Sequence, residues 1–145
     1  MSLKDRLMND LRDAMRSGDE LRKSTIRMAR AAIESAEATR RRELFATLLQ
    51  EAGIKYDDSE AVVDIEPGTI DSADIEQKSK LDDVGIEGVL ATAIKKRREA
   101  ADIYERNNRA DLAERERAEA DILEAYLPRQ MSEVEIEAEV RALIT

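Results

Sequence analysis

Apolar residues recur every three or four positions along most of this chain, and that spacing is typical of amphipathic α-helices. The first stripe has four residues spaced four apart, which are Leu3, Leu7, Leu11 and Met15. It predicts a helix over residues 3–16. Gly18 is suited to end this helix, and Ser17 with Glu20 fits a capping box that begins the next one. Because the two signals overlap, we expect a short turn and a helical hairpin.

A second and longer helix is predicted over residues 19–52, ending before Gly53. One of its faces is apolar or small and contains Leu21, Thr25, Met28, Ala29, Ala32, Ile33 and Ala36. Small side chains on that face would allow a neighbouring helix to approach closely.

Two more helices are predicted over residues 86–106 and 110–127, with a turn at Asn107 and Asn108, since asparagine tolerates left-handed backbone geometry. The inward residues of the first are Ile86, Val89, Leu90, Ala93, Ile94, Ala101 and Tyr104. Those of the second are Leu112, Ile122, Leu123 and Tyr126.

The stretch YLPRQMSEVE, residues 126–135, reads as a hinge. Pro128 cannot continue a helix, and Ser132 with Glu135 fits a capping box for a last helix. That helix places three apolar residues on one face, which are Ile136, Val140 and Leu143. A single amphipathic helix of about a dozen residues is marginal alone. It should therefore dock on the bundle, on another chain or on a partner.

Residues 54–85 lose the helical periodicity and gain acids and turn residues. Pro67 and Gly68 suit the centre of a β-turn between two β-prone pieces, Val62–Ile65 and Thr69–Ile70. We interpret the segment as an inserted acidic loop. A small hairpin within it and a solvated excursion without a role both remain open.

Composition then narrows the function. The chain has 145 residues, of which 42% are hydrophobic and 39% charged. It has no cysteine and no histidine, which excludes disulfides, Cys/His zinc sites, thiol nucleophiles and imidazole catalysis. No apolar run approaches the length of a membrane span, and the N-terminus lacks the apolar core of a signal peptide. We therefore expect a soluble cytoplasmic protein without a membrane role.

The net charge of −9 belongs to one segment. Residues 51–87 hold 12 acids and 3 bases, so the remainder, with 21 acids and 21 bases, is neutral. The acidic total consequently says little about what the rest of the chain can bind.

Motifs for catalysis and cofactors are missing from the sequence. The five glycines never form a phosphate-binding loop, no histidine can activate a serine, and the acidic loop does not match an EF-hand. Glutamate pairs such as Glu116 and Glu119 lack the histidine that accompanies them in metal-binding bundles. We expect no catalytic residue, no cofactor and no metal.

One acidic residue falls within an apolar stripe. Glu119 lies in helical phase with Leu112, Ile122 and Tyr126, and an unpaired buried carboxylate would be costly. Arg27 borders the small-residue face of the second helix. We predict a structural ion pair between Arg27 and Glu119, joined by Glu116 or Arg97.

Two basic runs are candidates for phosphate contacts. The first contains Arg40, Arg41 and Arg42, and the second contains Lys95, Lys96 and Arg98. Either could bind a nucleic-acid backbone. Either could instead be a solvated helix face balanced by neighbouring glutamates.

The stretch KKRREAADIYERNNRADLAERERAEADILEAYLPRQMSEVEIE resembles the GatB/YqeY family, as do residues 1–36. Members of this family are similar to the C-terminal region of the B subunit of the tRNA-dependent amidotransferase. The matching positions include Lys96, Arg97, Tyr104, Arg109, Asp111, Leu112, Glu116, Glu119, Ile122, Leu123, Tyr126, Leu127, Pro128 and Ser132.

The resemblance implies a helical bundle, a YLP hinge and a small tail domain, and in the amidotransferase this region recognises tRNA. It also implies carbon–nitrogen ligase activity with glutamine as amido-N-donor, but only within the larger enzyme. Two departures concern the acidic segment, which is longer than the family's connection, and the tail, of which only the first helix is present. A loss of tail contacts would weaken tRNA binding.

Together these patterns predict an all-α protein with an antiparallel four-helix bundle over residues 1–127, an acidic insertion at 54–85, and a hinge with one tail helix over 128–145. The predicted function is a non-catalytic module that binds tRNA or associates with an amidotransferase or another translation-related protein. The alternative is a protein-interaction or oligomerisation module, such as a homodimer formed through the last helix, that binds no nucleic acid.

Overall fold

A computed structural model describes residues 1–53, 70–128 and 133–144 of the chain, with backbone alone for 133–136 and 144. Every regular element in these ranges is an α-helix, so the all-α prediction is confirmed. The helices are α1 (Leu3–Ser17), α2 (Glu20–Glu51), α3 (Ser72–Ser79), α4 (Asp83–Arg106), α5 (Ala110–Glu124) and α6 (Glu133–Ile144).

The α1–α2 hairpin is closed by local caps. Gly18 adopts a left-handed φ of 72°, and its N–H donates to the carbonyl of Ala14. The N-cap of α2 is Asp19, whose side chain accepts from the Arg22 N–H, rather than the predicted Ser17. The short turn is as expected, and a carboxylate at the helix N-terminus also suits the helix dipole.

The main core lies between α1, the first half of α2, α4 and α5. Its buried residues are Leu3, Leu7, Leu11, Ile26, Ala29, Ile33, Ile86, Leu90, Ile94, Ala120, Leu123 and Tyr126. Met15 and Met28 were predicted to face inward, but their exposed fractions are 53% and 57%. Ala14 and Ile26 are buried instead. Residues spaced four apart drift by about 40° per step around a helix of 3.6 residues per turn, so Met15 leaves the buried face of α1 and Ala14 lies on it.

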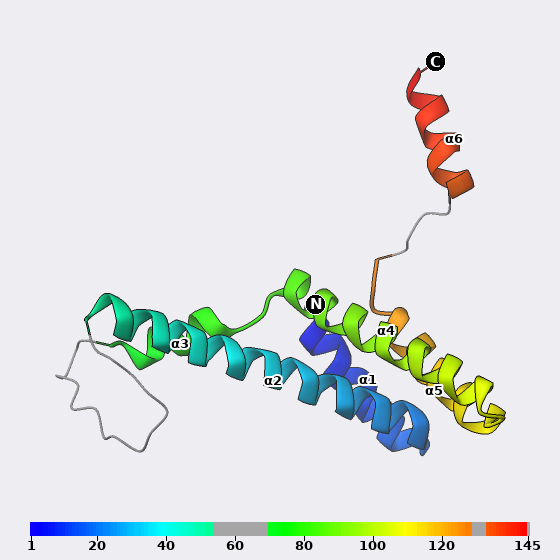
Figure 1. The fold of residues 1–145 in the computed structure, drawn as a ribbon, viewed down its shortest axis with the longest axis horizontal. Helices are drawn as coiled ribbons and strands as arrows, with labels where there is room; N and C mark the ends of the chain where they lie inside the picture. The colour runs from blue at the N-terminus through cyan, green and yellow to red at the C-terminus, as the bar shows by residue number, and fades with distance from the viewer. Residues whose placement is uncertain (54–69, 129–132, 145) are drawn as a thin grey trace.

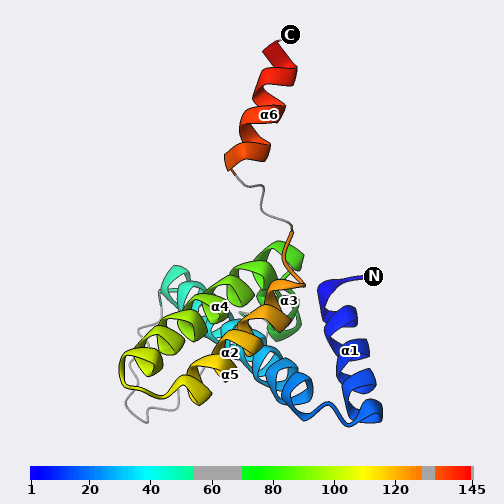
Figure 2. The same ribbon diagram turned by 90° about the vertical axis from the view of Figure 1, so that its right-hand side faces the viewer.

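Helices α4 and α5 lie antiparallel, joined by a turn in which Asn108 has a φ of 59°, and they pack against α2 and α1 (Figures 1 and 2). Helix α2 has 32 residues and is therefore about 48 Å long at 1.5 Å per residue. It extends well beyond α1, and α3 packs against its second half (Figure 1).

The second part of the acidic segment corrects the prediction of a loop up to residue 85. Asp71 caps α3 by accepting from the N–H groups of Ala73 and Asp74, and Ile75 and Ser79 are buried. Asp82 caps α4, which consequently begins three residues before the predicted start at Ile86. The proposed strand Val62–Ile65 and Thr69 of its partner lie outside the described residues.

The helix before Pro128 ends three residues earlier than the predicted 110–127. Helix α5 ends at Glu124, Tyr126 remains buried in the core, and α6 begins at Glu133. Among the helices that the structure describes, α6 packs on none of the others (Figures 1 and 2). Its Val140 and Leu143 side chains are 48% and 87% exposed. The division into a bundle and a tail domain stays a prediction.

Candidate functional site

An open groove of about 670 Å³ runs between α2 and α4. The wall formed by α2 consists of Met28, Ala29, Ala32, Ser35, Ala36 and Thr39. The wall formed by α4 consists of Gly85, Gly88, Val89, Thr92, Ala93, Lys96 and Arg97. Small and hydroxyl-bearing residues thus form most of its surface, so a ligand can approach both helix backbones closely.

The charge of this groove is of one sign. Its only charged lining residues in the described part of the chain are Lys96 and Arg97, and no carboxylate lines it. At the far end Arg42 donates to the hydroxyl oxygen of Thr39 at 3.2 Å, which holds a third cation beside the groove. Cations with hydroxyl groups and no competing acid form a surface suited to an anionic ligand.

Arg97 is held in place by a buried carboxylate. Its Nε donates to Oε2 of Glu119 at 3.3 Å and its Nη1 to the Ala93 carbonyl at 3.4 Å. Glu119 also accepts from Nε of Arg115 at 3.3 Å. Two guanidinium groups therefore share one carboxylate. Arg115 is 63% exposed and lines a different surface with Glu20, Asp111 and Glu114, so at the groove the charge of Arg97 is offset by Glu119.

The predicted pair of Arg27 with Glu119 is wrong in its cation. Glu119 is buried as expected, but its partners are Arg97, which the prediction had as an additional member, and Arg115. Arg27 is exposed, and its Nη2 lies 4.0 Å from the sulfur of Met15. The reason is geometric, since Arg97 comes from α4, the helix that forms the hairpin with α5.

The six predicted phosphate-binding residues do not gather on one surface. Lys95 and Arg98 line a different cavity, about 570 Å³ in volume, together with Glu99, Asp102 and Glu124. Arg98 is also paired with Glu124 and lies 3.9 Å from Asp121. On this face the positive charge is offset by neighbouring acids, which disfavours phosphate binding.

On α2 the basic run also divides. Arg41 is paired with Glu76 of α3 at 3.6 Å, whereas Arg40 is exposed and Arg42 contacts Thr39. Of the six residues, Lys96 lines the groove and Arg42 borders it. Neighbours in sequence separate in this way because successive residues of a helix point about 100° apart.

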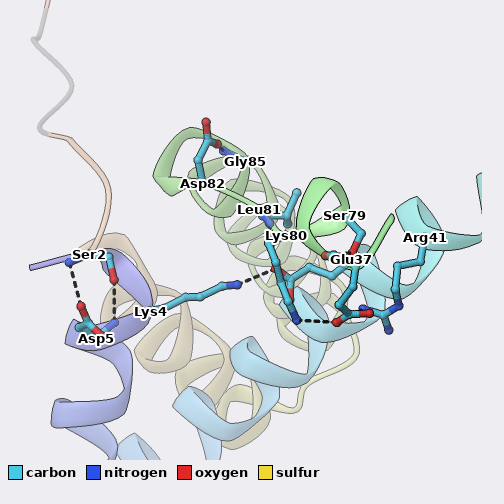
Figure 3. A network of polar contacts seen from close by, with 11 residues as sticks. Ser2, Lys4, Asp5, Glu37, Arg41, Ser79, Lys80, Leu81, Asp82 and Gly85 are labelled. Carbon is cyan, nitrogen blue, oxygen red and sulfur yellow. Dashed lines mark hydrogen bonds and ion pairs between the residues drawn. The ribbon is translucent and has the colours of Figure 1, made fainter. Parts of the chain in front are cut away.

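Sequence reasoning missed Glu37, which is only 4% exposed although it lies in the charged part of α2. Its Oε2 accepts from Nζ of Lys4 at 2.6 Å and from the backbone N–H of Leu81 at 2.8 Å (Figure 3). Glu37 thereby joins α1, α2 and the segment between α3 and α4. We refer to these three residues as the Glu37 latch.

Burial by itself raises the pKa of Glu37, but the hydrogen bonds from Lys4 and Leu81 outweigh it and hold the pKa below the usual value. Glu37 is therefore a stable carboxylate at neutral pH and no candidate for a general acid. A second contact supports the same corner, since Asp83 of α4 accepts from the N–H of Leu3 at 3.0 Å.

The contacts of Tyr126 explain why a tyrosine lies at the hinge. Its hydroxyl donates to Asp10 of α1, which also lies 3.4 Å from Arg22, and the guanidinium of Arg6 stacks 5.1 Å from the ring centroid. Burial, followed by the hydrogen bond and charge of Asp10, raises the pKa of Tyr126. Tyr126 therefore fixes the segment directly after α5 to α1.

In the sequence these sites gave only weak signals. Glu37 follows Ile33 by four residues and so continues the buried face of α2, which could have identified it. The groove had a clearer signal in the small residues of α2, but its second wall depends on how α4 crosses.

No helix within the described ranges has the length and apolar character needed to span a bilayer.

Comparison with known proteins places the chain in a family. The family model of the Yqey-like protein matches residues 4–55 and 54–145. The chain is also similar to altered inheritance of mitochondria protein 41, mitochondrial, of Lachancea thermotolerans, with 29% identity over 141 residues. The match covers 96% of this chain but 56% of that protein, so the chain spans about half the length of this curated relative. With almost its whole length matched by the family model, the chain belongs to the family of Yqey-like proteins.

Proposed function

We propose that this chain is a non-catalytic RNA-binding module that holds the phosphate backbone of tRNA in the groove between α2 and α4. The observation that carries the proposal is the charge of the groove. Lys96 and Arg97 line it, Arg42 borders it, and no carboxylate lines it in the described part of the chain. The hydroxyl groups of Ser35 and Thr39 add hydrogen-bond donors for phosphate oxygens, whereas that of Thr92 already donates to the Gly88 carbonyl.

The choice of tRNA rests on the resemblance of residues 95–135 to the tRNA-recognising region of the amidotransferase B subunit. An association with an amidotransferase or another translation-related protein follows from the same resemblance. A cytoplasmic location remains an expectation from the sequence, and the name of the relative refers to the mitochondrion for that protein only.

The size of the electrostatic effect can be worked out from the groove. Two phosphate contacts, at Arg42 and Lys96, predict a slope of log K against log salt of about −1.4 to −1.8, since Arg97 is already paired with Glu119. Affinity should then fall by about 7- to 12-fold between 50 and 200 mM salt. Groups on the Lys95 face should contribute little, because acids surround them.

The experiment is a fluorescence-anisotropy titration of labelled tRNA at these two salt concentrations with matched charge reversals. Lys96→Glu should weaken binding by about tenfold and reduce the salt slope by about one. Lys95→Glu is the control, because it makes the same charge change one residue away but outside the groove. Equal effects of the two variants, or no binding by the wild type at micromolar protein, would reject the groove as the RNA site.

A further inference from the structure

We propose that the groove between α2 and α4 also receives helix α6 from a second copy of this chain, and that two copies exchange these helices reciprocally. The proposal goes beyond RNA binding and concerns its regulation. It starts from two surfaces on which no other described helix packs, the open groove and the apolar face of α6 with Val140 and Leu143 exposed.

The lengths of the two surfaces agree. The wall of the groove on α4 extends from Gly85 to Arg97 and that on α2 from Met28 to Thr39, which correspond to about 20 Å and 18 Å of helix. Helix α6 has 12 residues and is therefore about 18 Å long. One α6 helix would fill the groove from end to end.

The charges are opposite. Helix α6 contains four glutamates and one arginine, whereas the groove is lined by cations and by no carboxylate within the described residues. Opposite charges of this kind favour association and select the partner.

The shapes also suit a helix. Alanine and glycine on the groove walls allow a close interaxial approach, and a Cβ atom built on Gly88 would meet nothing within 4 Å. Met28 is 57% exposed at the edge of the groove, where it offers an adaptable apolar contact to Val140 or Leu143. Docking would bury all three side chains.

A second copy is a better occupant than the chain's own α6. Pro128 lines the cavity on the Lys95 face of α4, on the other side of that helix from the groove. The five residue steps from Pro128 to Glu133 reach about 17 Å at full extension. That is about half the circumference of a helix with its side chains, so the connection would be fully taut before α6 entered the groove.

Exchange by two identical chains closes a two-fold dimer and covers the apolar face with Val140 and Leu143 in both copies. Because α6 would lie on Lys96 and Arg97, the dimer and bound RNA would exclude one another. The acidic helix would then act as a competitor of the phosphate backbone.

The absence of cysteine from the chain makes a direct test possible. Two single variants, Thr92→Cys and Val140→Cys, are mixed and oxidised, and a disulfide-linked heterodimer is expected in non-reducing electrophoresis. Ile103→Cys with Val140→Cys is the control, since Ile103 is 55% exposed but does not line the groove. A cross-link no stronger than the control would overturn the proposal.

The double variant Thr92→Cys/Val140→Cys distinguishes the two occupants. Dimers that are linked twice support exchange between copies, whereas a monomer closed by an internal disulfide would assign the groove to the chain's own α6 and overturn the proposal. Sedimentation velocity of the wild type over about 5–500 µM should show dimers. Leu143→Glu should raise their dissociation constant by about tenfold or more. A monomer throughout this range would also overturn it.

Titration with tRNA separates this proposal from the proposed function. Leu143→Glu should raise RNA affinity if the two ligands share the groove, and unchanged affinity in a variant that no longer dimerises would refute the competition. Failure of every variant to bind RNA, together with a Thr92–Val140 cross-link between copies, would reject the RNA site and leave the dimer intact.

Discussion

Removing the side chain of Lys4 or Glu37 from the Glu37 latch should destabilise the protein, and removing both should cost less than the sum of the two losses. Lys4 Nζ lies 2.6 Å from Oε2 of Glu37, and the two side chains are 40% and 5% exposed. Breaking a fully buried pair costs about 3–5 kcal/mol, and an exposed pair contributes about 0–1 kcal/mol. The half-exposed lysine places the coupling between these limits, at about 1.5 kcal/mol.

The single variants follow from the contacts that remain. Glu37→Gln keeps one acceptor for the Leu81 N–H but loses the charge, and should cost about 2 kcal/mol in the free energy of unfolding. Lys4→Met leaves the buried carboxylate with only the Leu81 N–H and should cost about 1.5 kcal/mol. The double variant should cost about 2 kcal/mol, which is less than the sum.

Urea denaturation of the wild type, the two single variants and the double variant at pH 7 completes a double-mutant cycle, which measures the coupling energy of Lys4 and Glu37. Denaturation at acid pH tests in which direction the charge of Glu37 changes stability. The folded pKa of Glu37 is depressed, so its contribution is present above the unfolded pKa of about 4.3 and is lost as the pH falls through the folded value. The wild type should therefore lose more stability than Glu37→Gln between pH 7 and pH 3. Lys78→Met is the control, because Lys78 pairs with the half-exposed Asp74 of α3 and is not one of the groups that lower the pKa of Glu37. A coupling below about 0.3 kcal/mol at pH 7 would refute the latch.

Two further predictions concern the other buried polar groups. Arg97→Met should lower the free energy of unfolding by about 3 kcal/mol, because Glu119 then keeps only the exposed Arg115, and adding Glu119→Leu should recover most of this loss. Arg27→Met is the control and should cost less than about 0.5 kcal/mol; equal losses in Arg97→Met and Arg27→Met would contradict the assigned pair. Tyr126→Phe should lower the free energy of unfolding by about 1–2 kcal/mol, because the hydrogen bond to Asp10 is lost. Since the pKa of Tyr126 is raised in the folded protein, tyrosinate absorbance at alkaline pH should differ between wild type and variant only after unfolding. A difference in the native proteins at about pH 10 would contradict the buried phenol.

Helix positions were largely predictable, because periodicity and caps act over a few residues. The 19–52 prediction is one residue longer than α2 at each end, and Gly18 ends α1 where expected, whereas α5 ends three residues before the predicted Leu127. The miss at residues 72–79 has a local cause. Helix α3 has eight residues and two buried ones, too few to produce a visible period in an acidic stretch.

The site was less predictable, because it depends on which helix faces which. Lys95 and Lys96 are equivalent in sequence, yet one lies among acids and the other lines the groove. Glu119 was recognised as buried, but its partner depends on the hairpin that brings Arg97 to it. Local sequence patterns indicate which face of each helix is buried, but they do not indicate how two helices cross.

The length of α2 has a consequence for how the molecule opens. Its first half belongs to the main core, while its second half is packed against α3 through contacts such as Arg41 with Glu76. The Glu37 latch lies where these two halves meet. The outer half with α3 can therefore unfold as a separate cooperative unit, with faster amide hydrogen exchange than the inner half. One continuous helix would thus contain two levels of protection, and the boundary between them would fall near residue 37.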